Sequence, residues 1–119
     1  MTTITQAMQE LLTCDGAMCA ALVDSSNGMI LGQGGSGVDL EVAAAGNTEV
    51  VRAKLKTMRA LGLSDVIEDI LITLGKQYHI LRPMARNEGL FIYLVLDKTK
   101  SNLAMARRKV QEVEKNLAV

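Results

Sequence analysis

The chain has 119 residues, 49% of them hydrophobic, which is enough for one self-sufficient core and too apolar for a disordered protein. Its 13 basic and 13 acidic residues cancel, so the formal net charge is zero. This balance argues against a general binder of nucleic acids or anionic membranes, because such proteins need excess positive charge to neutralise phosphates.

Membrane insertion and secretion are not expected from the sequence. The longest apolar runs, AMCAALV and LFIYLVL, fall far short of the about 20 residues that span a bilayer. No basic region precedes an apolar one at the N-terminus, which argues against a secretion signal. Cys14 and Cys19 have no matching partners, a pattern typical of a reducing compartment. We therefore expect a cytoplasmic protein.

The first third of the chain predicts a short helix and a β-hairpin. Apolar residues recur at helical spacing near the start, namely Ile4, Ala7, Met8, Leu11 and Leu12. This helix is expected to end near 15–16. The runs AMCAALVD (17–24) and MILGQ (29–33) predict two strands joined by a tight turn, in which Asn27 and Gly28 supply positive φ angles.

The stretch Gly32–Gly37, GQGGSG, matches the dinucleotide-binding pattern G-x-G-x-x-G. Such a site also needs a β-α-β unit, a free helix N-terminus and an acidic residue about 20 positions later. Here the preceding strand belongs to a hairpin, Asp39 occupies the next helix N-terminus, and no acid stands at that distance. No GK[ST] follows, so a P-loop is absent too. We interpret the stretch as a mobile tether, and a small-molecule sensor using it is kept as an alternative.

A long middle helix is predicted from its N-cap, Asp39, to about Leu61, and Gly62 is placed to end it. Three strands then follow as VIEDILITL (66–74), QYHILRP (77–83) and GLFIYLVLD (89–97). The last of them is apolar enough to be central. The order of elements predicts a single α+β domain over residues 1–119, built around an antiparallel sheet.

Punctuating residues set the other boundaries in this half of the chain. Gly75 and Lys76 are expected to form a hairpin turn, and Pro83 ends the strand after it, because proline cannot donate to a ladder. Ser101 is expected to cap a last helix running from Asn102 to about Ala118.

No catalytic, cofactor-binding or metal-binding residue is assigned. The only histidine, His79, lies in a predicted strand, where an ordinary half-buried residue is expected, and it cannot complete a zinc site with two cysteines. The acidic residues of SDVIEDI are Asp65, Glu68 and Asp69. On a strand Glu68 and Asp69 would point to opposite faces, so we interpret one of them as an exposed charge that discourages edge mispairing.

Two basic runs are interpreted as solvated helix faces rather than binding patches. They are Arg107, Arg108 and Lys109 on the last helix, and Arg52, Lys56 and Arg59 on the middle one. Aromatic residues make up 3% of the chain and tryptophan is absent, so neither an aromatic cage nor a base-stacking platform is available. We therefore expect a protein that is not an enzyme and needs no cofactor.

The last helix carries one apolar stripe, as a helix between a sheet and water requires. The stripe is Leu103, Ala106, Val110, Val113 and Leu117. The polar residues expected outside it are Arg107, Arg108, Gln111, Glu112, Glu114 and Lys115.

The middle helix, in contrast, carries two apolar faces. Its first stripe is Leu40, Ala44, Val51, Leu55 and Met58. A polar arc comprises Glu41, Thr48, Glu49, Arg52, Lys56 and Arg59. The second face, here called the seam, is Ala43, Gly46, Val50, Ala53, Thr57 and Ala60, with Val42 and Leu61 beside it.

The seam needs a cover, which is either the first and last helices or a second copy of the chain. We favour a second copy related by a two-fold axis, because small side chains let another helix approach closely. Gly46 costs the helix about 1 kcal/mol relative to alanine, a cost that close packing would offset. The start of the following strand is expected to join this dimer interface through Val66 and Ile67.

The order of these segments resembles a Roadblock domain, the family of the dynein light chain called Roadblock and its bacterial relatives. The likeness covers nearly the whole chain and is carried by VDSSNGMIL, DLEVAAA, ITLGKQYHILRP and LVLDKTKSNLAMAR. It implies a five-stranded antiparallel sheet with helices on both faces, in the order α-β-β-α-β-β-β-α. It also implies homodimers formed through the middle helix and the third strand.

The resemblance implies a non-enzymatic partner of a small Ras-like GTPase, and one bacterial relative promotes GTP hydrolysis by its partner. A structural adaptor that bridges a motor or signalling complex is the alternative. The family has no shared catalytic motif, so no arginine-finger role is assigned to Arg52, Arg59 or Arg86.

Overall fold

The computed structural model describes residues 2–87 and 89–119. In chain order its elements are α1 (Ile4–Leu11), β1 (Ala17–Asp24), β2 (Met29–Gly35), α2 (Leu40–Ala60), β3 (Ile70–Thr73), β4 (Gln77–Pro83), β5 (Leu90–Asp97) and α3 (Leu103–Asn116). The strands form one antiparallel sheet in the order β2-β1-β5-β4-β3. This is the predicted α+β fold, and the apolar fifth strand is central as expected.

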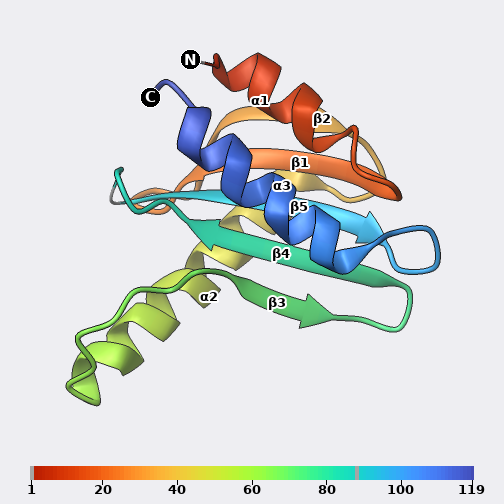
Figure 1. The fold of residues 1–119 in the computed structure, drawn as a ribbon. Coiled ribbons are helices and arrows are strands. Elements are labelled where there is room, and N and C mark those ends of the chain that lie inside the picture. Colours follow the sequence, from red (N-terminus) through yellow and green to blue (C-terminus); the bar gives the residue numbers. More distant parts are fainter. Residues whose placement is uncertain (1, 88) are drawn as a thin grey trace.

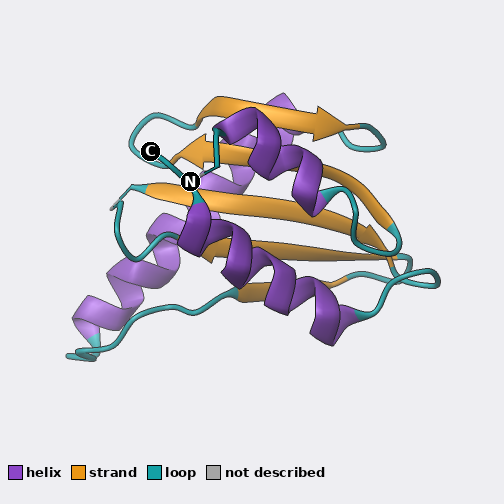
Figure 2. Cartoon of the chain, turned by 45° about the horizontal axis from the view of Figure 1, so that its top comes forward, coloured by secondary structure: helices purple, strands orange, loops and turns teal. Residues whose placement is uncertain are grey.

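Helices cover both faces of the sheet (Figure 1). Helices α1 and α3 lie on one face, and Figure 2 shows α2 behind the strands on the other. Alternation along β5 builds a core on each side: Ile92 and Leu94 pack toward α1 and α3, whereas Phe91 and Tyr93 pack toward α2. The central strand is therefore buried on both faces.

Helix boundaries follow the capping residues. Asp39 caps α2 as predicted, its carboxylate accepting from the Val42 amide at 3.3 Å. The cap of α3 is Asn102 and not Ser101, because the Asn102 side chain accepts from the Met105 amide at 3.1 Å.

Helix α1 is shorter than expected. The Thr13 hydroxyl donates to the Glu10 carbonyl at 2.6 Å, and the Thr13 amide also bonds to this carbonyl. A continuing helix would offer that carbonyl to the residue four positions on. The helix therefore ends at Leu11, before the region near 15–16 that the sequence suggested.

The β1–β2 turn uses one positive φ angle and not two. Gly28 has φ +75°, whereas Asn27 keeps a negative φ. The Asn27 side chain instead accepts from the Met29 amide at 3.0 Å and starts β2. The prediction that both residues supply positive φ was wrong, because the asparagine side chain stabilises the turn by a hydrogen bond.

The glycine-rich stretch is not a mobile tether, since β2 extends through Gly35. Gly32 pairs with Leu22 and Gly34 with Ala20, on the face that α1 covers. A Cβ at Gly32 would overlap the side chain of Ile4, and one at Gly34 would lie 3.0 Å from Leu12 Cδ1. Alternate glycines therefore let α1 lie directly on the edge strand.

Strand β3 is shorter than the predicted 66–74, with only Ile70–Thr73 paired to β4. Continuing the register of Ile70 with Leu81 would place Glu68 opposite Pro83, which has no N–H to donate. The Arg82 guanidinium donates a hydrogen bond to the Glu68 carbonyl instead, at 2.8 Å. Residues 64–69 consequently form an extended segment without ladder partners in this chain.

Candidate functional site

The two faces of α2 differ in exposure. Of the first stripe, Leu40, Ala44, Val51 and Met58 are buried and Leu55 is partly buried, as predicted. Thr48, which the sequence placed in the polar arc, is only 3% exposed. Its hydroxyl donates to the Ala44 carbonyl at 2.7 Å, so a local bond satisfies the buried oxygen.

The seam is open on the single chain. Ala43 is partly buried, and the other five residues of the seam are exposed. A Cβ built on Gly46 meets no other heavy atom within 4 Å. Helices α1 and α3 lie on the opposite face of the sheet (Figure 1), so they do not cover the seam, and that alternative was wrong.

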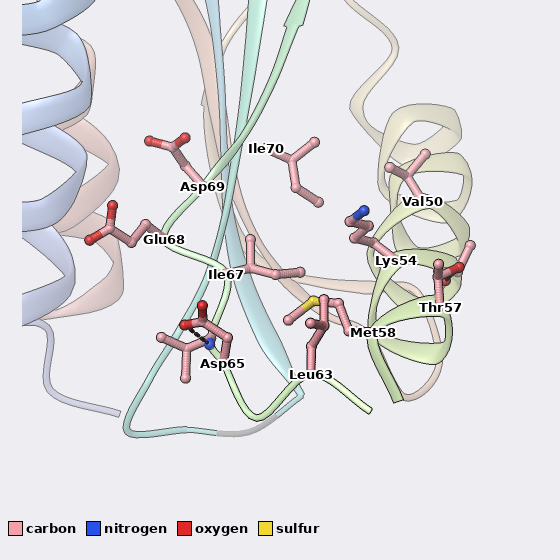
Figure 3. Close-up of a pocket in the computed structure, with 12 residues that line it drawn as sticks. Val50, Lys54, Thr57, Met58, Leu63, Asp65, Ile67, Glu68, Asp69 and Ile70 are labelled. Carbon is pink, nitrogen blue, oxygen red and sulfur yellow. Dashed lines mark hydrogen bonds between the residues drawn. The ribbon is translucent and has the colours of Figure 1, made fainter. Parts of the chain in front are cut away.

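A groove of about 1100 Å³ lies between the second half of α2 and the segment before β3 (Figure 3). Five of the eight predicted interface residues line it, namely Val50, Ala53, Thr57, Val66 and Ile67. Ile67 and Ile70 point toward α2, and the Val66 side chain is 74% exposed. The fold therefore joins the seam to the segment before β3 in one apolar surface.

Exposed apolar side chains continue this surface at the end of α2, which overhangs the sheet (Figures 1 and 2). Leu61 is 65% exposed and Leu63 is 53% exposed, and Val42 beside the seam is 68% exposed. A contiguous apolar surface of this kind marks an interaction site more often than isolated exposed residues do. We name the seam, Val66 and Ile67 together the α2 face.

The carboxylates near the groove do not form an acidic site. Asp69 accepts two hydrogen bonds from Arg107 of α3, at 2.7 and 3.2 Å, and this hydrogen bonding, together with the charge of Asp69, raises the pKa of Arg107. Arg107 is therefore a paired residue and not part of a solvated run. Glu68 and Asp69 both point to the α3 side (Figure 3), contrary to the expectation of opposite faces, because this segment is not a regular strand. Glu68 is exposed, as one of the two was expected to be.

His79 is held between two side chains on the α2 side of the sheet. Its Nδ1 lies 2.9 Å from the Tyr93 hydroxyl and its Nε2 lies 2.8 Å from Gln77 Oε1. Burial lowers the pKa of His79 and raises that of Tyr93 to about 12. A neutral imidazole thus accepts from the Tyr93 hydroxyl and donates to Gln77 Oε1, and the two hydrogen bonds fix the orientation of the ring. His79 is half-buried, as expected from the sequence.

Glu114 of α3 is buried, although its position in the sequence predicted the polar side of the helix. It is 5% exposed and pairs with the Arg82 Nε, while its Oε2 accepts from the Ala85 amide at 2.9 Å. The spacing could have indicated this burial, because Glu114 follows Val110 by four residues and precedes Leu117 by three, which places it on the apolar stripe. Arg86 also bonds to the end of α3, through the carbonyls of residues 114 and 115.

Across residues 2–87 and 89–119, no cluster of three or more histidine, cysteine, aspartate or glutamate side chains is arranged to hold a metal ion. Within the same residues, no helix has the length and apolarity needed to cross a membrane.

Comparison with known proteins identifies the architecture. No protein-family model matches the sequence, and a search of curated proteins gives no match. The Roadblock/LC7 domain from Streptomyces avermitilis superposes with a TM-score of 0.82 at 12% identity, covering 96% of this chain and 93% of that one. Myxococcus xanthus MglB superposes with a TM-score of 0.82 at 16% identity, covering 94% and 89% of the two chains.

An MglB with a tetrameric arrangement gives a TM-score of 0.79 at 18% identity, covering 92% of this chain and 80% of that one. At such identities the likeness concerns the fold, and it extends over almost the whole chain. The superpositions cover the whole architecture of this chain, which has the sheet order β2-β1-β5-β4-β3, two helices on one face and one long helix on the other. The fold of this chain is the Roadblock fold.

Proposed function

We propose that the chain is a non-enzymatic interaction module that forms a homodimer through the α2 face and binds a small Ras-like GTPase, which it regulates or scaffolds. The observation that carries the proposal is the open seam of α2, joined by the groove to Val66 and Ile67. A helix that only covered its own sheet would need one apolar stripe, and this helix has two.

Two further observations support self-association. The chain has zero net charge, so little long-range repulsion opposes the approach of a second copy. An MglB of the same fold has a tetrameric arrangement, so self-association occurs in that protein. Support for a GTPase partner comes from the resemblance of the sequence segments to Roadblock domains and from the shared fold.

Substitutions in the seam test the dimer. The chain is expected to sediment as a dimer at micromolar concentration. Ala53→Glu is expected to raise the dissociation constant at least about 100-fold, because it brings a carboxylate without a partner into each half of a symmetric apolar contact. Gly46→Leu is expected to act similarly by filling the space that close approach requires.

Ala104→Glu is the matched control, since Ala104 is also exposed but lies on α3, across the sheet. It should leave the dimer intact, and circular dichroism should show all three variants folded. A wild-type chain that sediments only as a monomer at these concentrations would contradict the dimer.

A nucleotide-dependent binding assay tests the GTPase partner. Small Ras-like GTPases encoded beside this chain, or a panel from the same organism, are loaded with GDP or with a non-hydrolysable GTP analogue and captured with the immobilised protein. A regulator is expected to bind one nucleotide state at least about tenfold more tightly, because only differential affinity can shift a switch. Equal binding of both states would favour a structural adaptor, and no binding to any GTPase would overturn this part of the proposal.

A further inference from the structure

The spacing of the seam is the same from either end of the helix. Its six positions are separated by 3, 4, 3, 4 and 3 residues, with the midpoint between Val51 and Arg52. Two copies of α2 packed antiparallel about that midpoint would place Val50 against Ala53 and Gly46 against Thr57. The Thr57 hydroxyl donates to the Ala53 carbonyl at 2.9 Å within its own helix, so it brings no unsatisfied donor to the contact.

The charged residues that border the seam have a definite order. Glu49 and Lys56 are both exposed and lie seven residues apart, so they sit within about 20° of each other on the border that faces away from the sheet. The opposite border carries Lys54, which lines the groove (Figure 3). Among the described residues, neither Glu49 nor Lys56 has an ion-pair partner within 4.0 Å. Both charges are available to a second molecule.

An antiparallel contact brings these two charges together. A two-fold axis perpendicular to the plane of the two helices sets the outer border of one copy beside the outer border of the other. Glu49 stands 2.5 residues before the midpoint and Lys56 stands 4.5 residues after it. The mismatch of two residues is about 3 Å along the helix, within reach of a lysine side chain. A parallel contact about an axis along the helices would instead set the outer border of one copy beside the opposite border of the other, which carries Lys54, so Glu49 and Lys56 would not meet.

We propose that Glu49 and Lys56 select a second copy of this chain in the antiparallel orientation, each Glu49 pairing with Lys56 of the other copy. The pairing rests on the homodimer proposed above and adds its orientation and its selectivity. Because the contact is symmetric, the pair occurs twice, and reversing one charge converts both attractions into repulsions. The positions of Glu49 and Lys56 on this border thereby favour a second copy of this chain over a chain whose charges are placed differently.

Charge reversal tests the pairing. Glu49→Lys and Lys56→Glu are each expected to weaken self-association about tenfold or more at low ionic strength, and the effect should shrink in high salt. An equimolar mixture of the two variants is expected to restore wild-type affinity as a heterodimer, because both cross pairs are then attractive. Sedimentation at several concentrations and exchange between fluorescently labelled copies measure both quantities.

Arg52→Glu supplies the matched control. Arg52 is exposed on the same helix but faces away from the seam, so its reversal should change self-association less than about threefold, and its mixture with Glu49→Lys should not restore affinity. If the wild-type chain is monomeric, the homodimer itself fails. If the wild-type chain dimerises and the reversed pair does not restore affinity, the Glu49–Lys56 pairing is overturned while the homodimer stands.

Discussion

Gly35→Ala is expected to lower the free energy of unfolding by about 3 kcal/mol, from a left-handed conformation costing about 1 kcal/mol and overpacking costing about 2 kcal/mol. Gly35 has φ +79°, and its Cβ would overlap the Met18 carbonyl oxygen and lie 2.7 Å from Cys19 Cα. These atoms belong to the backbone of β1, which cannot move aside without breaking its ladder with β5. Denaturant unfolding at one fixed protein concentration measures the loss.

Substitutions at two other glycines separate the cost of the left-handed conformation from the cost of overpacking. Gly62 has φ +71° with no neighbour within 4 Å of a Cβ, so Gly62→Ala should cost only the left-handed conformation, about 1 kcal/mol. Gly46 is helical and open, so Gly46→Ala should stabilise the monomer by about 0.5–1 kcal/mol. A Gly35→Ala variant no less stable than Gly62→Ala would show that β1 does not lie this close to Gly35.

Glu114→Ala is expected to destabilise the domain by about 3–5 kcal/mol, the range found when one partner of a buried ion pair is removed. The substitution leaves the Arg82 guanidinium, whose side chain is 18% exposed, beside an apolar core. It also removes the acceptor of the Ala85 amide. Thermal unfolding should follow the loss with a melting temperature at least about 10 °C lower.

The control lies two residues earlier on the same helix. Glu112 pairs with Lys109 at 4.0 Å and its side chain is 58% exposed, so Glu112→Ala should change stability by no more than about 0.5 kcal/mol. Replacing both buried partners, as Arg82→Met with Glu114→Leu, should recover most of the loss, because no unpaired charge remains. Equal losses for Glu112→Ala and Glu114→Ala would show that the buried pair contributes little.

Segments whose boundaries are set locally could be predicted from the sequence. Strand β1 and strand β4 have the expected bounds, the latter because Pro83 itself ends the ladder. Helix α2 begins and ends where Asp39 and Gly62 indicate. The exposure of the seam could also be anticipated, because helical periodicity alone assigns residues to faces.

Features that depend on distant partners could not be predicted in this way. The start of β3 is determined by a proline in the neighbouring strand, and no pattern within 66–74 indicates that register. The pairs Arg82–Glu114 and Asp69–Arg107 join residues 32 and 38 positions apart. Without knowledge of its partner, each of these charged residues is expected on a solvated surface. Thr48 was misassigned because its hydroxyl is satisfied by its own helix.

The contact of α1 with alternate glycines of β2 has a consequence for how such chains diverge. The Ile4 side chain occupies the space that a side chain at residue 32 would need, and Leu12 stands in the same relation to Gly34. A lineage can therefore enlarge one member of a pair only after shrinking the other. In this chain the two glycines separated by one residue, Gly32 and Gly34, therefore mark the place where α1 crosses the edge strand β2.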